Sequence, residues 1–135
     1  MASRNVLLYG ILFCLIISAY CCDVVKYPYG ARLYESQCAD CHMNDGSGLS
    51  SLYPNLQNAN IVTKYKEIPC IIRNGINDTT SIIQMLPMVN VSDIEITNII
   101  NFILQDMNGT KLSISIQEVQ EILDSCKVEP NLKLR

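Results

Sequence analysis

Apolar residues recur along the chain at helical spacing, and no run alternates between apolar and polar positions for long enough to predict a β-strand. The clearest helix opens with a capping box formed by Ser92 and Glu95. Its apolar positions follow the i, i+3, i+4, i+7 pattern: Ile96, Ile99, Ile100 and Ile103. We expect it to end near Asn108-Gly109, where glycine favours the turn that closes a helix. The pattern predicts an all-α fold.

A second capping box predicts an additional helix near the C-terminus. Ser115 pairs with Glu118 in this box, and the helix that follows carries an apolar stripe. Cys126 lies on that stripe and should therefore face the domain. We expect this C-terminal helical extension to cover about residues 113–127.

Two further helices are expected upstream. Helix formers from Ala31 onward predict a helix whose C-terminus carries the cysteine pair that begins at Cys38. A short helix is expected over residues 67–74, with Pro69 in its first turn and Gly75 ending it. The segments after these two helices are rich in glycine, asparagine and serine, and we expect loops there.

The first 22 residues differ from the rest of the chain. Arg4 precedes an apolar run over residues 6–21, which is the pattern of a secretory signal and is short for a membrane span of about 20 residues. We interpret residues 1–22 as a signal peptide or lipoprotein signal. An uncleaved anchor helix is the alternative, and either one predicts export.

Composition limits the remaining chain to one domain. The protein has 135 residues, of which 49% are hydrophobic, so residues 23–135 can form a single modest globular domain. The net charge is −3, and no basic run of the kind that binds phosphate backbones is present. We therefore expect no nucleic-acid partner.

Cys21 and Cys22 stand where a lipoprotein signal places its acylated cysteine, which makes lipid attachment to a membrane surface a hypothesis.

The stretch "CADCHMNDG" carries the candidate chemistry. Cys38, Cys41 and the only histidine of the chain, His42, lie within five positions. C-x-x-C spacing serves zinc sites, dithiol redox couples and thioether attachment of haem. Only haem attachment explains the histidine directly after the second cysteine, because that histidine binds the iron.

The roles of the other cysteines depend on whether Cys38 and Cys41 carry haem. If Cys38 and Cys41 carry haem, Cys70 and Cys126 form a natural disulfide in an exported protein. If they do not, all four cysteines could bind zinc, although the wide spacing of the second two is unusual for such a site. Two independent buried thiols are the remaining alternative.

From Gly30 to Leu104, the chain resembles the class I, monohaem cytochromes c, as an exported bacterial member of that family. The family has a glycine and an aromatic residue before the haem cysteines, and both pack against an aromatic on the C-terminal helix. Gly30, Tyr34 and Phe102 match these positions. The resemblance implies the cytochrome c fold, one covalent haem c with its iron, and a proline carbonyl, here that of Pro54, bound to the haem histidine.

The family also implies a methionine as the second axial ligand. The stretch "QMLPMVNVSD" offers Met85 and Met88, and the usual distance to the acidic residue of the next helix favours Met85. The sequence departs from the family at Leu86, where proline is usual. Arg73 is a candidate partner for a haem propionate, and a solvated arginine is the alternative.

An iron with histidine and thioether ligands can exchange one electron but has no open position for a substrate. We therefore expect an electron carrier rather than an enzyme, exported to the periplasm. Its expected partners are other redox proteins and not a small-molecule substrate. Two alternatives remain open. One is a cytochrome subunit of a larger redox complex, and the other is a haem sensor or enzyme with an open distal site.

Overall fold

The structure is a computed structural model that describes residues 9–11, 13–14, 25–77 and 83–126. Within those residues the fold is helical, and the extended contacts are isolated bridges rather than strands. This agrees with the all-α prediction and with the cytochrome c fold. The elements in chain order are α2 (Pro28–Gln37), α3 (Ala39–His42), α4 (Ala59–Thr63), η1 (Tyr65–Glu67), α5 (Ile68–Asn74), α6 (Asp93–Asn101), η2 (Phe102–Met107) and α7 (Ile116–Cys126).

The helices begin where the sequence supplies the appropriate caps. α2 begins earlier than expected, because Pro28 is favourable in a first helical turn. The capping box of Ser92 and Glu95 is present at α6, with both reciprocal hydrogen bonds formed. Ser115 and Glu118 make the same pair of contacts at α7. The two capping boxes predicted from the sequence are therefore confirmed.

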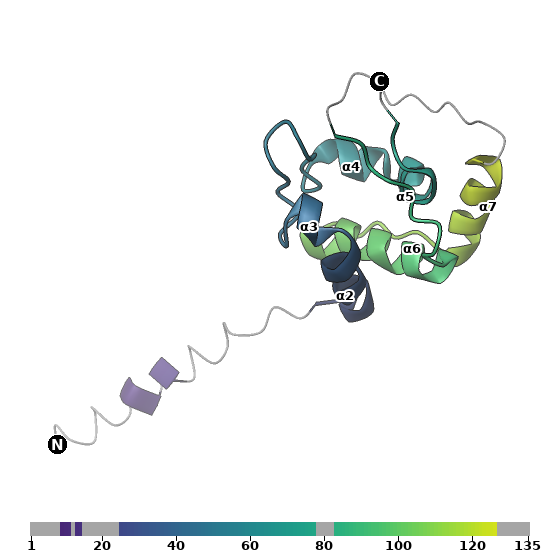
Figure 1. Ribbon diagram of the computed structural model, residues 1–135. Coiled ribbons are helices and arrows are strands. Elements are labelled where there is room, and N and C mark those ends of the chain that lie inside the picture. Colours follow the sequence, from purple (N-terminus) through teal and green to yellow (C-terminus); the bar gives the residue numbers. More distant parts are fainter. Residues whose placement is uncertain (1–8, 12, 15–24, 78–82, 127–135) are drawn as a thin grey trace, which may run out of the picture.

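The core forms where α2 and α7 pack against α6 (Figure 1). The isoleucine stripe that runs from α6 into η2 faces this core, and each of its members is at most 4% exposed: Ile96, Ile99, Ile100 and Ile103. Complete burial of such a side chain stabilises the fold by roughly 1.5–3 kcal/mol. Val119 of α7 is fully buried against the same core, so the C-terminal helix is an integral part of the domain.

After α6 the helix widens into the π-helical turn η2, and Asn108 caps its end, close to the predicted terminus. Buried Asn101 then fixes the chain on its way to α7. Its side-chain amide donates to the carbonyl of Ile114 at 3.0 Å and its oxygen accepts from the Ile114 N–H at 2.9 Å. These two bonds satisfy a buried polar side chain and set where α7 begins.

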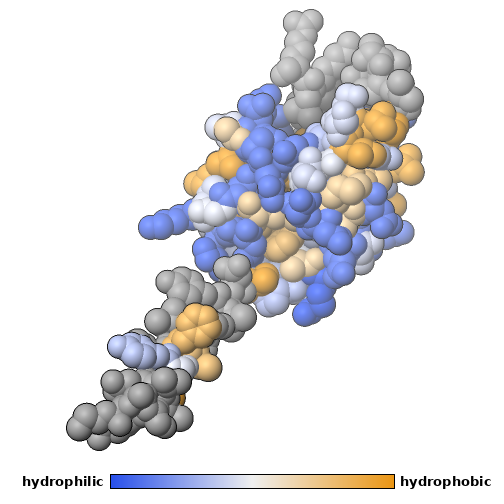
Figure 2. Space-filling view, turned by 90° about the vertical axis from the view of Figure 1, so that its left-hand side faces the viewer, coloured by the Kyte–Doolittle hydropathy of each residue, from blue (hydrophilic) through white to orange (hydrophobic). Residues whose placement is uncertain are grey.

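Residues 9–11 and 13–14 are helical, and the side chains of Tyr9, Ile11 and Phe13 are exposed. Most of the predicted signal, including Cys21 and Cys22, lies outside the described residues. No helix within the described ranges is both long and apolar enough to cross a bilayer. The face seen in Figure 2 is largely hydrophilic, with apolar side chains gathered near its upper edge.

Candidate functional site

The C-x-x-C-H motif occupies one short helical turn. Cys38 ends α2, and its carbonyl accepts hydrogen bonds from the N–H groups of Cys41 at 3.2 Å and His42 at 2.9 Å. Both cysteines are free thiols; Cys41 is exposed and Cys38 is half-buried. Burial, together with a smaller contribution from the neighbouring Cys41, raises the pKa of the Cys38 thiol to about 11. A single helical turn therefore carries both sulfurs and the imidazole.

The imidazole of His42 is held by the carbonyl predicted from the sequence. Its Nδ1 lies 3.0 Å from the carbonyl oxygen of Pro54. Because a carbonyl can only accept, this contact assigns the proton of a neutral imidazole to Nδ1. The lone pair on Nε2 is then available to a metal, and the hydrogen bond on the opposite nitrogen increases its basicity as a ligand.

Gly48 allows the Pro54 carbonyl to reach the histidine, a role that sequence reasoning missed. Its φ of +70° is in the left-handed region, and a Cβ built there would lie 2.7 Å from the Pro54 carbonyl oxygen. The N–H of Gly48 also donates to the carbonyl of His42 at 3.0 Å. The sequence signal for this role is a glycine in the loop that leaves the C-x-x-C-H motif and then has to return to it.

Tyr34 anchors the other side of the motif. Its hydroxyl donates to the carbonyl of Met43 at 2.8 Å, and its ring packs against Phe102 with centroids 5.5 Å apart. Burial raises the pKa of Tyr34, which keeps the hydroxyl protonated as a donor. One turn earlier, a Cβ on Gly30 would lie 2.9 Å from Phe102 Cβ, so glycine permits the close crossing of α2 and α6. The predicted arrangement of Gly30, Tyr34 and Phe102 is confirmed.

The backbone around both candidate methionines is attached to α5 and to the residues that directly follow it. The carbonyl of Met85 accepts from the N–H of Ile76 at 2.9 Å, and the N–H of Met88 donates to the carbonyl of Ile72 at 3.0 Å. Gly75, with φ +70°, permits this approach, because a Cβ there would collide with the backbone of the methionine segment. Both methionine side chains are half-buried against the core, so the choice of Met85 stays a prediction.

Cys70 and Cys126 are joined by a disulfide that ties α5 to α7, with Cα atoms 5.8 Å apart. The bond makes both sulfurs unavailable as thiolates, which excludes a zinc site built from these two and the C-x-x-C pair. Among the described residues, no group of three or more histidine, cysteine or acidic side chains is placed to hold a metal ion. The guanidinium of Arg73 bonds to Val89 and Asp93, so this arginine is not merely solvated, and a contact with a haem propionate stays a prediction.

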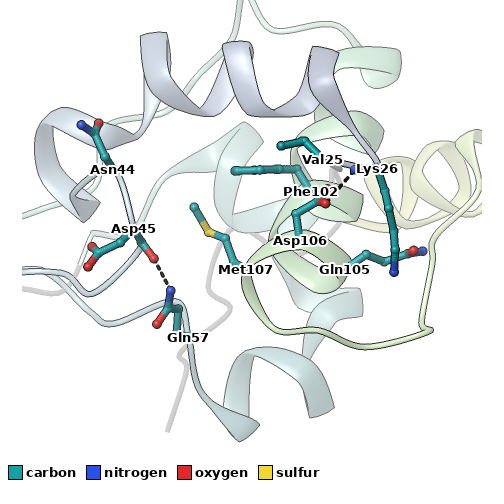
Figure 3. Close-up of a pocket in the computed structure, with 9 residues that line it drawn as sticks. All are labelled: Val25, Lys26, Asn44, Asp45, Gln57, Phe102, Gln105, Asp106 and Met107. Carbon is teal, nitrogen blue, oxygen red and sulfur yellow. Dashed lines mark hydrogen bonds between the residues drawn. The ribbon is translucent and has the colours of Figure 1, made fainter. Parts of the chain in front are cut away.

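A separate hollow of about 500 Å³ lies between the loop that carries Asn44 and Asp45 and the π-helical turn η2 (Figure 3). Met107 and Phe102 contribute apolar surface, and polar side chains surround them. Several polar groups here are already paired: Asp106 accepts from the backbone N–H of Lys26, and the Gln57 amide donates to the Asp45 carbonyl. None of the predicted haem ligands lines this hollow.

The residues present fit a covalently attached haem. Two free thiols stand at the spacing needed for two thioether bonds, and His42 offers Nε2 to an iron. Large apolar side chains on the loops that carry Pro54 and Met85 are exposed: Leu49 at 46%, Leu52 at 44% and Leu86 at 77%. A flat apolar group bound at the motif would give such side chains a surface to cover.

Comparison with known proteins agrees with a covalently attached haem. Residues 26–103, more than half of the chain, match the family described as cytochrome c oxidase, cbb3-type, subunit III. The chain is also 28% identical over 104 residues to the cytochrome c subunit of a quinone alcohol dehydrogenase from Gluconobacter oxydans. That match covers 69% of this chain but only 21% of the relative, so the chain spans about a fifth of that protein's length. The chain therefore belongs to the family of c-type cytochromes defined by the cbb3-type oxidase subunit III domain, and it binds haem c covalently.

Proposed function

We propose that this protein is a one-electron carrier whose iron is bound by Nε2 of His42 and by the thioether of Met85. The observation that carries the proposal is the 3.0 Å contact between His42 Nδ1 and the Pro54 carbonyl, which leaves Nε2 free for the iron. Haem held by an imidazole and a thioether supplies a reversible Fe(III)/Fe(II) couple with no open coordination position.

The protein residues have distinct tasks in this proposal. Cys38 and Cys41 keep the cofactor from dissociating, and the Pro54 carbonyl holds the proton on Nδ1 so that the ring keeps one orientation. The backbone bond between Ile76 and the Met85 carbonyl supports placement of the thioether by α5. A weakly donating methionine favours Fe(II) and therefore raises the reduction potential.

Two methionine variants test the ligand assignment. Met85→Ala in the holoprotein should abolish the weak charge-transfer band at the red end of the visible spectrum that marks an iron-thioether bond. Met88→Ala is the matched control, because Met88 lies three residues away and is also half-buried. Loss of the band in Met88→Ala alone would move the assignment to Met88.

We further propose that the carrier acts outside the cytoplasm and exchanges electrons with other redox proteins, either as a free protein or as a subunit of an oxidoreductase. The cytochrome subunit from Gluconobacter supports the subunit alternative, although it is a much longer protein. The apolar run over residues 6–21 supports export, and acylation at Cys21 or Cys22 would tether the domain to a membrane. Mass spectrometry of the mature N-terminus tests this: an unmodified chain that begins at Asp23 would refute tethering.

A further inference from the structure

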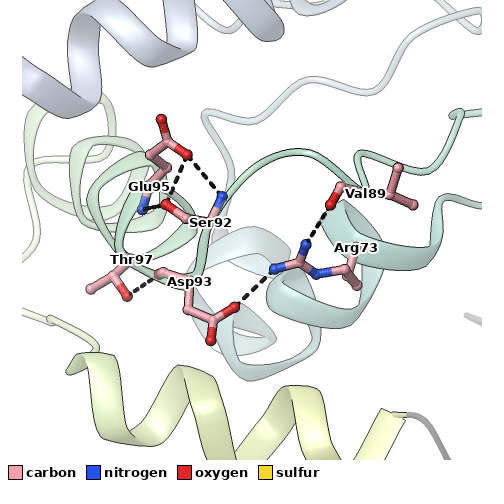
Figure 4. Close-up of polar contacts among 6 residues, drawn as sticks. All are labelled: Arg73, Val89, Ser92, Asp93, Glu95 and Thr97. Atoms are coloured by element: carbon pink, nitrogen blue, oxygen red, sulfur yellow. Dashed lines mark hydrogen bonds and ion pairs between the residues drawn. The ribbon is translucent and has the colours of Figure 1, made fainter.

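Arg73 joins three parts of the fold at the end of α5 (Figure 4). Its Nη1 donates to the carbonyl of Val89 at 3.1 Å, and its Nη2 donates to Oδ1 of Asp93 at 2.8 Å. Val89 belongs to the segment over residues 83–90 that carries both methionines, and Asp93 is the first residue of α6. One guanidinium therefore connects α5, the methionine segment and α6.

We infer that Arg73 is a positioning residue for the methionine segment, holding it in register against α5 and α6. This inference deepens the proposed function, because it gives a physical reason why a loop with little regular structure could present a thioether at one place. The alternative is that Arg73 simply forms an ion pair between two helices. In that case, its loss would weaken the whole fold without loosening the methionine segment in particular.

The partner on α6 is itself fixed. Asp93 stands in the first turn, where a carboxylate is stabilised by the helix dipole, and its carbonyl accepts from the Thr97 hydroxyl at 2.7 Å. The adjacent capping box of Ser92 and Glu95 fixes the same end of the helix. Figure 4 shows the guanidinium of Arg73 between the Asp93 carboxylate at this capped end and the Val89 carbonyl. Asp93 therefore gives Arg73 a fixed hydrogen-bond partner, and Arg73 in turn holds the methionine segment.

The chemistry of the site favours arginine over lysine. The guanidinium is a planar fork, so two of its nitrogens can donate in different directions at once. A single ammonium nitrogen on the shorter lysine side chain could serve Asp93 or Val89, but it lacks the geometry of the fork. The pair is partly exposed, with 25% of the Arg73 side chain and 37% of the Asp93 side chain accessible. Its net energy is therefore modest, and its main effect is to fix position.

Local opening of the methionine segment is the quantity that separates the two roles. The N–H of Met88 is bonded to the Ile72 carbonyl of α5, and the N–H of Ile76, just after α5, is bonded to the Met85 carbonyl. Both amides therefore report whether the segment is attached to α5 and its C-terminal end. The amides of Ile99 and Ile100, in the fully buried part of α6, report global unfolding.

The experiment is native-state hydrogen exchange on the holoprotein and on its Arg73→Met variant. Loss of a charge-assisted hydrogen bond should speed exchange at Met88 and Ile76 by about tenfold relative to the Ile99 amide. Arg73→Lys should recover only part of the protection. Arg32→Met is the matched control, since Arg32 lies on α2 against the ring of Tyr29, and it should leave the ratio unchanged.

Equal acceleration at all these amides, or no acceleration at Met88 and Ile76, would overturn the positioning role. The red charge-transfer band measured on the same samples tests the proposed function separately. Faster local exchange together with a band that does not depend on Met85 would keep Arg73 as a positioning residue and refute Met85 as the ligand. Faster exchange with a weakened, Met85-dependent band would support both.

Discussion

The disulfide between Cys70 and Cys126 should contribute a large part of the stability of this small domain. We consider three variants: Cys70→Ala, Cys126→Ala and the double variant. The bond joins residues separated by 56 positions in the sequence. For a closed loop of this size, the restriction of the unfolded chain amounts to about 4 kcal/mol. Small domains are typically stable by about 5–15 kcal/mol, so the loss should be easy to measure.

Urea unfolding followed by circular dichroism gives the free energy of unfolding for each variant. Either single substitution breaks the bond, so each should cost nearly the full amount. The double variant should cost about the same as a single one, because the second substitution removes only a half-buried thiol. Wild-type protein reduced with dithiothreitol should match the double variant.

Strict additivity of the two single substitutions would contradict this reasoning, because it would mean that the two cysteines stabilise the fold independently. A loss below about 1 kcal/mol in each single variant would also contradict it, since the loop would then add little order to the unfolded chain. Thiol labelling of the unfolded, unreduced wild type provides a check on the bond itself: neither Cys70 nor Cys126 should react.

Three more outcomes are expected. Gly30→Ala should destabilise the fold by about 1–2 kcal/mol in urea unfolding, because the overpacked helix crossing outweighs the gain in helix propensity; a stabilised variant would refute the close crossing. Hydrogen bonds from the cap serines lower the pKa of Glu95 and Glu118. The contribution of these carboxylates to the free energy of unfolding is therefore present above the ordinary carboxyl range and is lost as the pH falls through the lowered pKa values. Glu95→Gln should make stability depend less on pH in the acidic range. Gly48→Ala should lower the basicity of His42 as a ligand and shift the reduction potential, which potentiometry would detect; an unchanged potential would argue against the role of the loop.

Much of the fold could be predicted because its signals are local. The isoleucine spacing of α6 and both capping boxes follow from residues three or four positions apart, and the structure contains them as expected. The contact of Tyr34 with Phe102 is not local, and it was predicted only through the family resemblance.

The parts that could not be predicted depend on tertiary distance. Arg73 carries no sequence signal for its partners, since Asp93 lies 20 positions away and Val89 offers only a backbone carbonyl. The role of Gly48 likewise depends on where the chain returns, because the Pro54 carbonyl approaches only after a tight turn. The family's spacing favours Met85 over Met88, but the structure does not separate the two, because both lie on the same segment and both pack against the core.

The most direct test of a closed, His42- and Met85-bound electron carrier is the addition of carbon monoxide to the reduced holoprotein. With imidazole and thioether on the two axial positions, the visible spectrum should remain that of the untreated reduced protein. Met85→Ala opens the distal position and should give a carbon monoxide complex, which serves as the positive control. Rapid, stoichiometric formation of that complex by the wild type would contradict the account and indicate a haem protein with an open distal site.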